Sequence, residues 1–447
     1  MADDWNTVQL GEVAVVRSGY AFKSSDWQGS GIPVVKIANV KGGRLEMSGC
    51  SFVTEATAAE AVDFQLSSGD ILIAMTGYIG DVARVRKTDL PCVLNQRVGK
   101  FSVRDKSRLD PDYLYTFLSW VETRRTIESL GYGSAQPNVS PSLIHKIELP
   151  LPPLPEQRAI ASVLGALDDK IDLNRRMCQT LEEMARTLFK SWFVDFDPVR
   201  AKMEGRDPGL PKEIADLFPS RLVDSELGPI PEGWRPQSLS DYFAMGMGGA
   251  WGDDEQIRPG AIQVRCLRGI DCHALAEGEL PEVPLRWVTQ KQLNDRRLSR
   301  GTLLVEGSGS FCGRSLLWRD EYAALFNEPV IYSNFCKRLD PVATPSEAFM
   351  AWYHMRRSYE LGALAGFRAG TAFPNFDMHG ALRGVRMPRA PIEITGVFEK
   401  IATQLSRVDL RVQSATLAAL RDTLLPKLIS GELRVPASLG SMQEVAT

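Results

Sequence analysis

The chain has 447 residues, of which 44% are hydrophobic and 24% charged, and this length predicts two to four globular domains. The net charge of −3 argues against a uniformly basic nucleic-acid-binding protein, although it is compatible with a local basic face. We expect no membrane-spanning helix, because no apolar run reaches the roughly 18 residues that one requires.

The cysteines and the N-terminus favour a cytoplasmic protein. The seven cysteines are odd in number and include no Cys-x-x-Cys pair, so we expect reduced thiols and neither a disulfide framework nor a zinc site. The four histidines are far apart in the sequence, which argues against a metal centre. The first residues lack the basic and apolar stretches of a secretory signal.

Residues 1–150 show the pattern of a mixed α+β domain. Short β-type runs such as Ile32–Ile37 and Ile71–Ile73 are separated by glycine-rich turns. A helix is expected from Pro111 to Leu118, continuing toward Ser129.

Residues 151–193 are expected to form one long helix. Prolines stand before its start, where they are tolerated, and apolar residues then recur at alternating steps of three and four. A helix over residues 155–192 would be roughly 55 Å long at ~1.5 Å per residue, which suits a spacer. Residues 194–233 are rich in Pro, Asp and Gly and predict a linker with one short helix near Ile214–Phe218.

The second half of the chain repeats this plan. Residues 234–389 predict a second mixed domain, with a strand at Leu303–Val305 and a helix at Ser346–Leu364. Residues 390–433 predict a second long helix, with an unbroken three–four alternation, and residues 434–447 form a tail.

Ordered sequence matches indicate that the two halves arose by duplication. Gly133–Asn138 recurs as Gly370–Asn375, with four of six residues identical, 237 positions later. Trp5 and Leu10 match Trp234 and Leu239, and further pairs follow in the same order. We therefore predict an α+β fold with two mixed domains separated by two long antiparallel helices and related by a pseudo-two-fold repeat.

The apolar stripes predict the seam along which the two helices pack. The expected seam residues are Ile160, Leu164, Leu167, Ile171, Leu181 and Leu188 in the first helix and Phe398, Ile401, Leu405, Val408 and Val412 in the second. Met177 and Met184 continue the first stripe, and Asn174 lies within it, where a buried polar residue would set the register. Glu182 and Glu183 are expected to be solvated.

Catalytic motifs are missing from the sequence. The only Pro-Pro pair, at Pro152-Pro153, has the wrong neighbours for an adenine methyltransferase loop. Gly307–Ser315 imitates a P-loop, but its interval is one residue too long and Arg314 replaces the lysine. This pattern favours binding over catalysis.

A duplicated protein can place one domain on each half of a two-fold DNA site. We select polar, basic and aromatic residues in or beside turns as candidate DNA contacts. In the first domain they are Arg17, Tyr20, Lys23, Lys36, Asn39, Lys41, Thr76, Tyr78, Asn95, Gln96, Arg97 and Asn138. In the second they are Trp251, Arg265, Arg268, Ser308, Ser310, Arg314, Asn334, Arg368 and Asn375. For the repeated turns that end at Asn138 and Asn375, two interpretations stay open, a phosphate contact and, as we favour, a structural turn that docks the domain onto its helix.

The chain resembles the specificity subunits of type I restriction–modification systems. The resemblance is strongest in Leu149–Leu164, Leu167–Asn174, Trp192–Asp197 and Leu227–Trp234, and it extends to Trp5, Leu10-Gly11 and Leu428–Leu433. The second copy departs from the family pattern, because Ala390–Thr395 lacks the Pro-Glu-Gln-Arg sequence of residues 155–158. No role of Glu156, Gln157 or Arg158 is therefore transferred to it.

The resemblance implies a non-catalytic subunit with two target recognition domains that bind a gapped, asymmetric sequence in double-stranded DNA. It implies two methyltransferase partners, which use S-adenosylmethionine to methylate adenine, and restriction subunits, which use ATP and Mg²⁺. This chain would bind no cofactor itself and would work in the cytoplasm of a bacterium or archaeon. A free-standing DNA-binding regulator or a protein scaffold on the same duplicated plan is the alternative.

Overall fold

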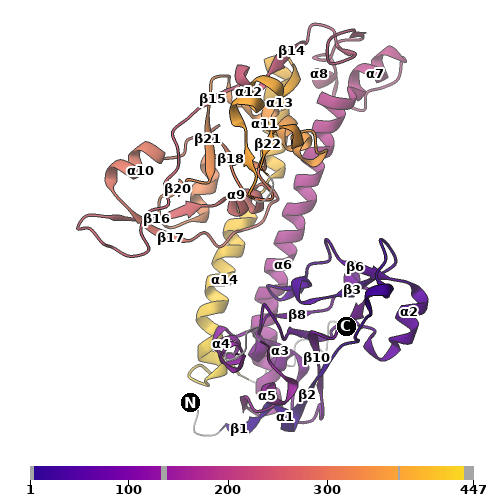
Figure 1. Ribbon diagram of the computed structural model, residues 1–447, viewed down its shortest axis with the longest axis vertical. Coiled ribbons are helices and arrows are strands. Elements are labelled where there is room, and N and C mark those ends of the chain that lie inside the picture. Colours follow the sequence, from indigo (N-terminus) through magenta and orange to yellow (C-terminus); the bar gives the residue numbers. More distant parts are fainter. Residues whose placement is uncertain (1–4, 132–137, 371–372, 437–447) are drawn as a thin grey trace. The chain divides into compact units, whose positions relative to one another are not determined.

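The computed structural model describes residues 5–131, 138–370 and 373–436 (Figure 1). The chain forms two compact units. Unit 1 comprises Met1–Asp169 with Leu417–Thr447, and unit 2 comprises Lys170–Thr416. The boundary falls inside two long helices, so each unit contains one part of each of them.

Unit 1 is built on a four-stranded antiparallel sheet in the order β2-β10-β7-β8. A three-stranded sheet, β6-β3-β9, includes the parallel pair β3–β9, and β1 pairs with β11. The strands are β1 (Asn6–Gln9), β2 (Ala14–Ser18), β3 (Ile32–Val35), β4 (Val40–Lys41), β5 (Arg44–Leu45), β6 (Ser51–Val53), β7 (Ile71–Ala74), β8 (Val82–Arg84), β9 (Val93–Leu94), β10 (Val98–Val103) and β11 (Glu148–Leu151). The short helices are α1 (Leu10–Val13), α2 (Glu55–Glu60), α3 (Pro111–Ser119), α4 (Val121–Leu130) and α5 (Pro141–Ile144).

Unit 2 repeats this topology. Its sheets have the orders β15-β21-β18-β19 and β17-β16-β20, with β16 parallel to β20, and β14 pairs with β24. The strands are β12 (Leu222–Val223), β13 (Ile230–Pro231), β14 (Arg235–Ser238), β15 (Phe243–Met245), β16 (Ile262–Leu267), β17 (Leu285–Val288), β18 (Leu303–Glu306), β19 (Ser315–Leu317), β20 (Val330–Tyr332), β21 (Cys336–Pro341), β22 (Arg368–Ala369), β23 (Asn375–Phe376) and β24 (Arg386–Arg389). The helices are α7 (Asp197–Met203), α8 (Lys212–Ala215), α9 (Gly269–Ala276), α10 (Gln290–Arg296), α11 (Pro345–Glu360), α12 (Met378–Gly384) and α13 (Ile392–Leu405). The matching strand orders confirm the predicted duplication.

Local sequence explains where the helices of the two sheet domains begin. Asp110 caps α3 by accepting hydrogen bonds from the backbone N–H groups of Asp112 and Tyr113, and Pro111 occupies the first turn. In the second unit Pro345 again opens the helix, and the Thr344 N–H donates to Glu347 Oε2 at 3.1 Å. Both starts follow the signals in the sequence.

The first long helix, α6, spans Leu154–Lys190, as the sequence predicts. A π-helical turn, Ser191–Asp195, follows it, and Phe196 ends it in the left-handed region with φ 58°. At its start the buried Gln157 fastens the helix to unit 1, since its side chain accepts from the Asp110 N–H and donates to the carbonyls of Arg108 and Pro152, each at 2.8 Å. This contact gives Gln157 of the Pro-Glu-Gln-Arg sequence a structural role.

The second long segment differs from the expected single helix. It consists of α13 and of α14 (Val408–Ile429), separated at Ser406 and Arg407, where Arg407 has φ 44°. The carbonyls released at this break are satisfied by side chains, because Cys178 donates to the Arg407 carbonyl and Arg411 donates to the Ser406 carbonyl. The break contains no glycine or proline, so no local signal predicts it.

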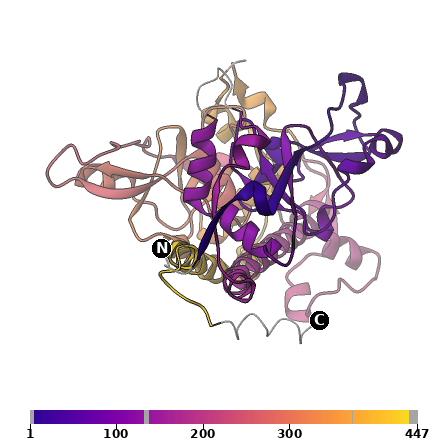
Figure 2. The ribbon, with the colours of Figure 1, turned by 90° about the horizontal axis from the view of Figure 1, so that it is seen from below.

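The two long segments pack antiparallel within each unit. In unit 2, Asn174 contacts Gln413 while Cys178 contacts Arg407. In unit 1, Asp168 pairs with Arg421, and the Glu156 carboxylate accepts from Arg434 and Trp5. Figure 2 shows the ends of α6 and α14 side by side at unit 1.

The predicted seam holds in unit 1 and is rotated in unit 2. Ile160 and Leu164 are buried in the unit 1 core together with Leu425, Leu428 and Ile429. Leu167 packs at the edge of that core. In the core of unit 2, Phe398 is buried, and four predicted seam residues pack at the edge: Leu188, Ile401, Leu405 and Val408. The remaining seam residues, Ile171, Leu181 and Val412, are half-buried. The buried line of α6 in unit 2 comprises Asn174, Cys178, Glu182, Ala185 and Phe189.

Two methionines that continue the predicted seam are therefore exposed and do not belong to the core. Met177 and Met184 are 39% and 52% exposed, because the buried line runs one residue further along α6. One residue corresponds to a rotation of about 100° around the helix. The expectation that Glu182 is solvated is wrong, since its side chain is buried, whereas Glu183 is exposed.

The predicted linker belongs to the core of unit 2. Residues 194–233 contain α7 as well as α8, and Val199 and Phe218 from this segment are buried with Trp234. Phe196 packs edge-on against Trp234 with ring centroids 5.7 Å apart. These buried side chains anchor a segment that its Pro, Asp and Gly content marked as irregular.

Candidate nucleic-acid interface

Loop residues of unit 1 converge at one end of its four-stranded sheet. In the antiparallel register Ser18 faces Gly99 and Ala74 faces Val98, so β2 and β7 end where β10 begins. The Met75 N–H donates to the Arg97 carbonyl at 3.2 Å, which ties the two loops together. We call the loops at this end, residues 18–20, 75–80, 95–97 and 138–140, the unit 1 loop surface.

A pocket of about 400 Å³ opens in this surface. Four of the candidate residues, Thr76, Gln96, Arg97 and Asn138, contribute to its lining. Gln96 and Arg97 are exposed at the turn before β10. The pocket thus gathers a guanidinium, two side-chain amides and a hydroxyl, which are the groups that hydrogen-bond base edges and phosphates.

Asn138 contacts the unit 1 loop surface through Thr76. Its Oδ1 accepts a hydrogen bond from Thr76 Oγ1 at 2.9 Å, and the two residues also form an isolated β-bridge. The rest of the repeated turn, residues 133–137, lies outside the described residues. Asn138 therefore contacts the loop after β7, whereas the structural interpretation had placed this turn against a long helix.

Other candidates lie beside the same loops. The Tyr20 N–H donates to the Leu94 carbonyl and the Asn95 N–H to the Val35 carbonyl, which brings Tyr20, Asn95 and Lys36 together. Lys36 donates to Ser51 at 2.7 Å and lies 3.8 Å over the Trp27 ring, so intramolecular contacts hold its ammonium group.

Arg17, Lys23, Lys41 and Tyr78 are exposed. The Lys41 ammonium lies 5.9 Å from the centre of the Tyr78 ring. Asn39, by contrast, is buried, and its side chain bonds to the Lys36 N–H and the Glu46 carbonyl, each at 2.8 Å. The Asn39 side chain therefore stabilises its own turn and is too buried to contact DNA, which corrects the expectation from the sequence.

Unit 2 has the same loop frame. The Gly307 N–H donates to the Phe335 carbonyl at 2.8 Å, and Ser308 bridges to Asn375 as Thr76 does to Asn138. We call the corresponding loops, residues 246–251, 307–313, 333–335 and 373–375, the unit 2 loop surface. The candidates Ser310, Asn334 and Asn375 are exposed on it.

The arginines selected in unit 2 are mostly engaged within the protein. Arg314 pairs with Glu306 at 2.9 Å, Arg265 pairs with Glu328 at 2.8 Å, and both oxygens of Asp271 accept from Arg268 at 2.8 Å. The guanidinium of Arg368 lies over the Tyr359 ring. The candidate Trp251 is half-buried, and the guanidinium of Arg286, which was not a candidate, lies 4.1 Å from the centre of its ring. These charges are less available for DNA than the sequence suggested.

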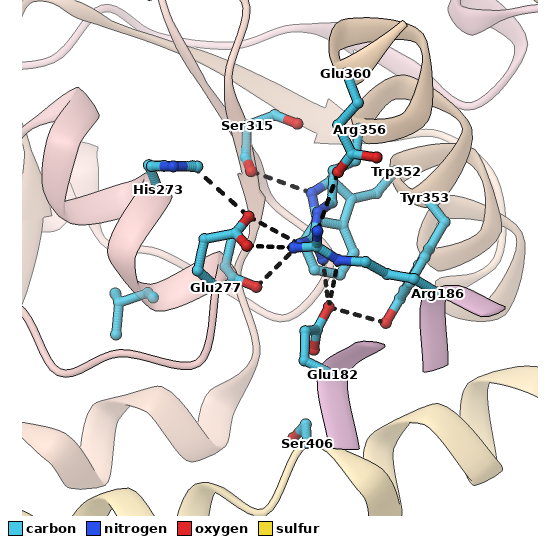
Figure 3. A network of polar contacts seen from close by, with 12 residues as sticks. Glu182, Arg186, His273, Glu277, Ser315, Trp352, Tyr353, Arg356, Glu360 and Ser406 are labelled. Carbon is cyan, nitrogen blue, oxygen red and sulfur yellow. Dashed lines mark hydrogen bonds and ion pairs between the residues drawn. The ribbon is translucent and has the colours of Figure 1, made fainter. Parts of the chain in front are cut away.

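A buried ionic network that the sequence does not predict joins α6 to α11 (Figure 3). Glu182 of α6 accepts from Arg356 of α11 at 2.5 Å, and Arg356 also pairs with Glu277 at 3.2 Å. Burial alone would lower the pKa of Arg356, but Glu182, Tyr353 and Glu277 together outweigh this effect and raise the pKa. Arg186 and Arg356 likewise hold the pKa of Glu277 below its usual value, against the effect of burial. The network fixes α6 to the sheet domain of unit 2.

Membrane-spanning helices and metal-binding clusters are both absent from the described part of the chain. No helix there is long and apolar enough to cross a membrane. Among the same residues, no group of three or more His, Cys, Asp or Glu side chains is placed to hold a metal ion.

Part of the chain is similar in sequence to a known family of DNA specificity domains. Residues 2–183 match the model of the type I restriction modification DNA specificity domain. The MjaVIII specificity subunit of Methanocaldococcus jannaschii is 30% identical over 42% of this chain, which corresponds to 44% of that protein's own length. The MjaIX specificity subunit of the same organism is 24% identical over 97% of this chain and 94% of its own length.

A solved structure supports the fold. The type I restriction–modification S subunit from M. genitalium aligns over 96% of this chain and 97% of its own, with a TM-score of 0.51 and 15% identity. The chain is thus similar in sequence to type I restriction–modification specificity subunits, and similar in fold to a solved S subunit.

Proposed function

We propose that the chain gives a type I restriction–modification complex its DNA sequence specificity, with unit 1 recognising one half of a gapped, asymmetric site and unit 2 the other. The repeated loop frame is the observation that carries the proposal. The bridges Thr76–Asn138 and Ser308–Asn375 build equivalent surfaces on which different side chains stand. Two such surfaces suit two half-sites of different sequence.

In this proposal the chain itself catalyses no reaction. Two methyltransferase subunits bring S-adenosylmethionine and methylate adenine, and restriction subunits supply cleavage that depends on ATP and Mg²⁺. Exposed apolar residues on α6 support docking of a partner, because Leu173, Met177 and Met184 are between 39% and 52% exposed. The helices also set the distance between the two half-sites.

A domain exchange tests the modular assignment. Residues 1–150 are replaced by the corresponding domain of a related subunit, and the hybrid is expressed with its methyltransferase partners. Single-molecule mapping of methylated adenines should show one half of the target changed and the other half kept. Alteration of both halves would refute the assignment, and failure to co-purify with a methyltransferase would favour the free-standing regulator or scaffold.

A further inference from the structure

Arg97 and Phe335 occupy equivalent places in the two units. The Arg97 carbonyl accepts from the Met75 N–H in unit 1, and the Phe335 carbonyl accepts from the Gly307 N–H in unit 2. Each residue stands directly before the strand, β10 or β21, that runs through the middle of its sheet. The same backbone position thus presents a guanidinium in one unit and an aromatic ring in the other.

Two more exposed rings belong to the loops of the unit 2 loop surface. Phe311, Phe335 and Phe373 are 57%, 60% and 78% exposed and come from three different loops. The Gly309 N–H donates to the Pro374 carbonyl at 2.9 Å, so the loop of Phe311 lies against the segment of Phe373. Such a cluster of exposed rings on one surface marks an interaction site.

Two candidate arginines of unit 2 are already paired. Arg314 stacks on Phe311 at 4.4 Å, but its guanidinium is held by Glu306, and the two side chains are only 12% and 13% exposed. Arg268 is held by Asp271 through two hydrogen bonds. Neither arginine is free to form the bidentate contact with guanine that dominates polar base recognition.

We propose that unit 2 recognises its half-site chiefly by apolar contact, with Phe311, Phe335 and Phe373 pressing into a base step that they unstack, whereas unit 1 uses the polar groups around Arg97. This inference rests on the proposed function. DNA is favoured as the occupant because the equivalent surface of unit 1 presents base- and phosphate-binding groups. Apolar side chains that enter a base step kink the duplex, and aromatic rings stack on the bases that they separate.

The test uses the complete complex of this chain with its methyltransferase subunits. The variant F311A/F335A/F373A is compared with V342A, a matched control that removes an apolar side chain of 60% exposure in the same unit. The probe is duplex carrying the mapped target, with 2-aminopurine replacing in turn each adenine of the second half-site, on either strand, except the methylated one. We expect a severalfold rise in fluorescence at one base step for the wild type and V342A, and none for the triple variant. Its DNA affinity should fall at least about tenfold.

Three outcomes would overturn the inference. The first is a wild-type complex that unstacks no base step, and the second is a triple variant that keeps both the fluorescence signal and the DNA affinity. The third is a triple variant that no longer assembles with the methyltransferase, because the rings would then form a protein-docking surface. The proposed function fails separately, if the wild-type complex methylates no gapped target. F335R is a second variant that keeps a large side chain at this position, and it should change the methylated sequence in the second half-site only. An unchanged methylated sequence would also contradict the proposal.

Discussion

Arg356 of α11 and Glu182 of α6 form an ion pair with 2.5 Å between Nη1 and Oε1, and their side chains are only 6% and 7% exposed. The second guanidinium nitrogen donates to the Ala276 carbonyl at 3.1 Å, so a single arginine connects α6, α9 and α11. A buried pair of this kind is tolerated because each charge compensates the other.

Removal of one partner should therefore be costly. We expect E182Q to lower the free energy of unfolding by about 3–5 kcal/mol, because it leaves the Arg356 charge buried without its main partner. E183Q is the matched control, since Glu183 is the exposed neighbour on the same helix and its loss should cost less than about 0.5 kcal/mol. Urea unfolding of both variants measures the difference, and equal values would show that the pair contributes little.

Acidification should destabilise the protein through His354. Burial lowers the pKa of His354 to about 3, and its Nε2 has no hydrogen-bond partner among the described residues. In the unfolded chain a histidine has a pKa of about 6.5, so the unfolded state binds the proton first. The contribution of His354 to stability is complete above pH ~6.5 and is lost, at up to ~1.4 kcal/mol per pH unit, as the pH falls toward 3.

The substitution H354L should flatten this part of the pH profile. His354 packs edge-on against Phe189 at 4.7 Å, which an aliphatic side chain can replace. H379Q, at an exposed histidine of the same unit, should keep the wild-type slope. Denaturant unfolding between pH 7 and 5 is the measurement, and an unchanged slope in H354L would remove His354 as the cause.

The duplication could be predicted because its signals are local and ordered. Trp5 and Trp234, and the two turns ending at Asn138 and Asn375, repeat at nearly constant spacing, and matching sheets then follow from matching strands. The start of α6 was also accessible, since prolines mark it. These features depend on residues close together in the chain.

Long-range charge pairing could not be predicted. Glu182 looked solvated because its partner Arg356 is 174 positions away, and the buried line of α6 rotates to meet that partner. In the same way, Arg265 and Arg268 looked like DNA contacts until the fold brought Glu328 and the Glu282 carbonyl to them. Composition gives the charges, but only tertiary structure shows which of them remain exposed to a ligand.

Asn174 should contribute through a buried amide. Its Nδ2 lies 2.8 Å from Gln413 Oε1 and 3.3 Å from Ser414 Oγ, and the residue is 1% exposed. N174A should lower the free energy of unfolding by about 1–3 kcal/mol, because it removes these bonds and leaves a cavity. R176A, at an exposed position two residues later, is the control. Comparable losses in both variants would show that the buried amide has no special part in pairing α6 with α14.

Arg97 should act on one half of the DNA target. R97A in the complete methyltransferase complex should weaken binding by about 1–3 kcal/mol, roughly 5- to 150-fold, and relax the sequence requirement at one position of the unit 1 half-site. R125A is the control, since Arg125 is exposed on α4 outside the loop surface. Binding titrations together with methylation mapping distinguish the two effects. A uniform loss on all sequences would instead assign Arg97 to the phosphate backbone.

Helix length should set the gap between the half-sites. The boundary of the two units falls at residues 169–170 of α6 and 416–417 of α14, which makes these the positions for insertion. One heptad added to both helices lengthens each by ~10 Å and should widen the gap by roughly three base pairs. A heptad preserves the packing face, whereas an insertion in only one helix breaks the antiparallel register and should abolish activity. If the complex with both helices extended is active and still methylates the original target, the helices do not set the gap, because the distance between the half-sites would then be independent of helix length.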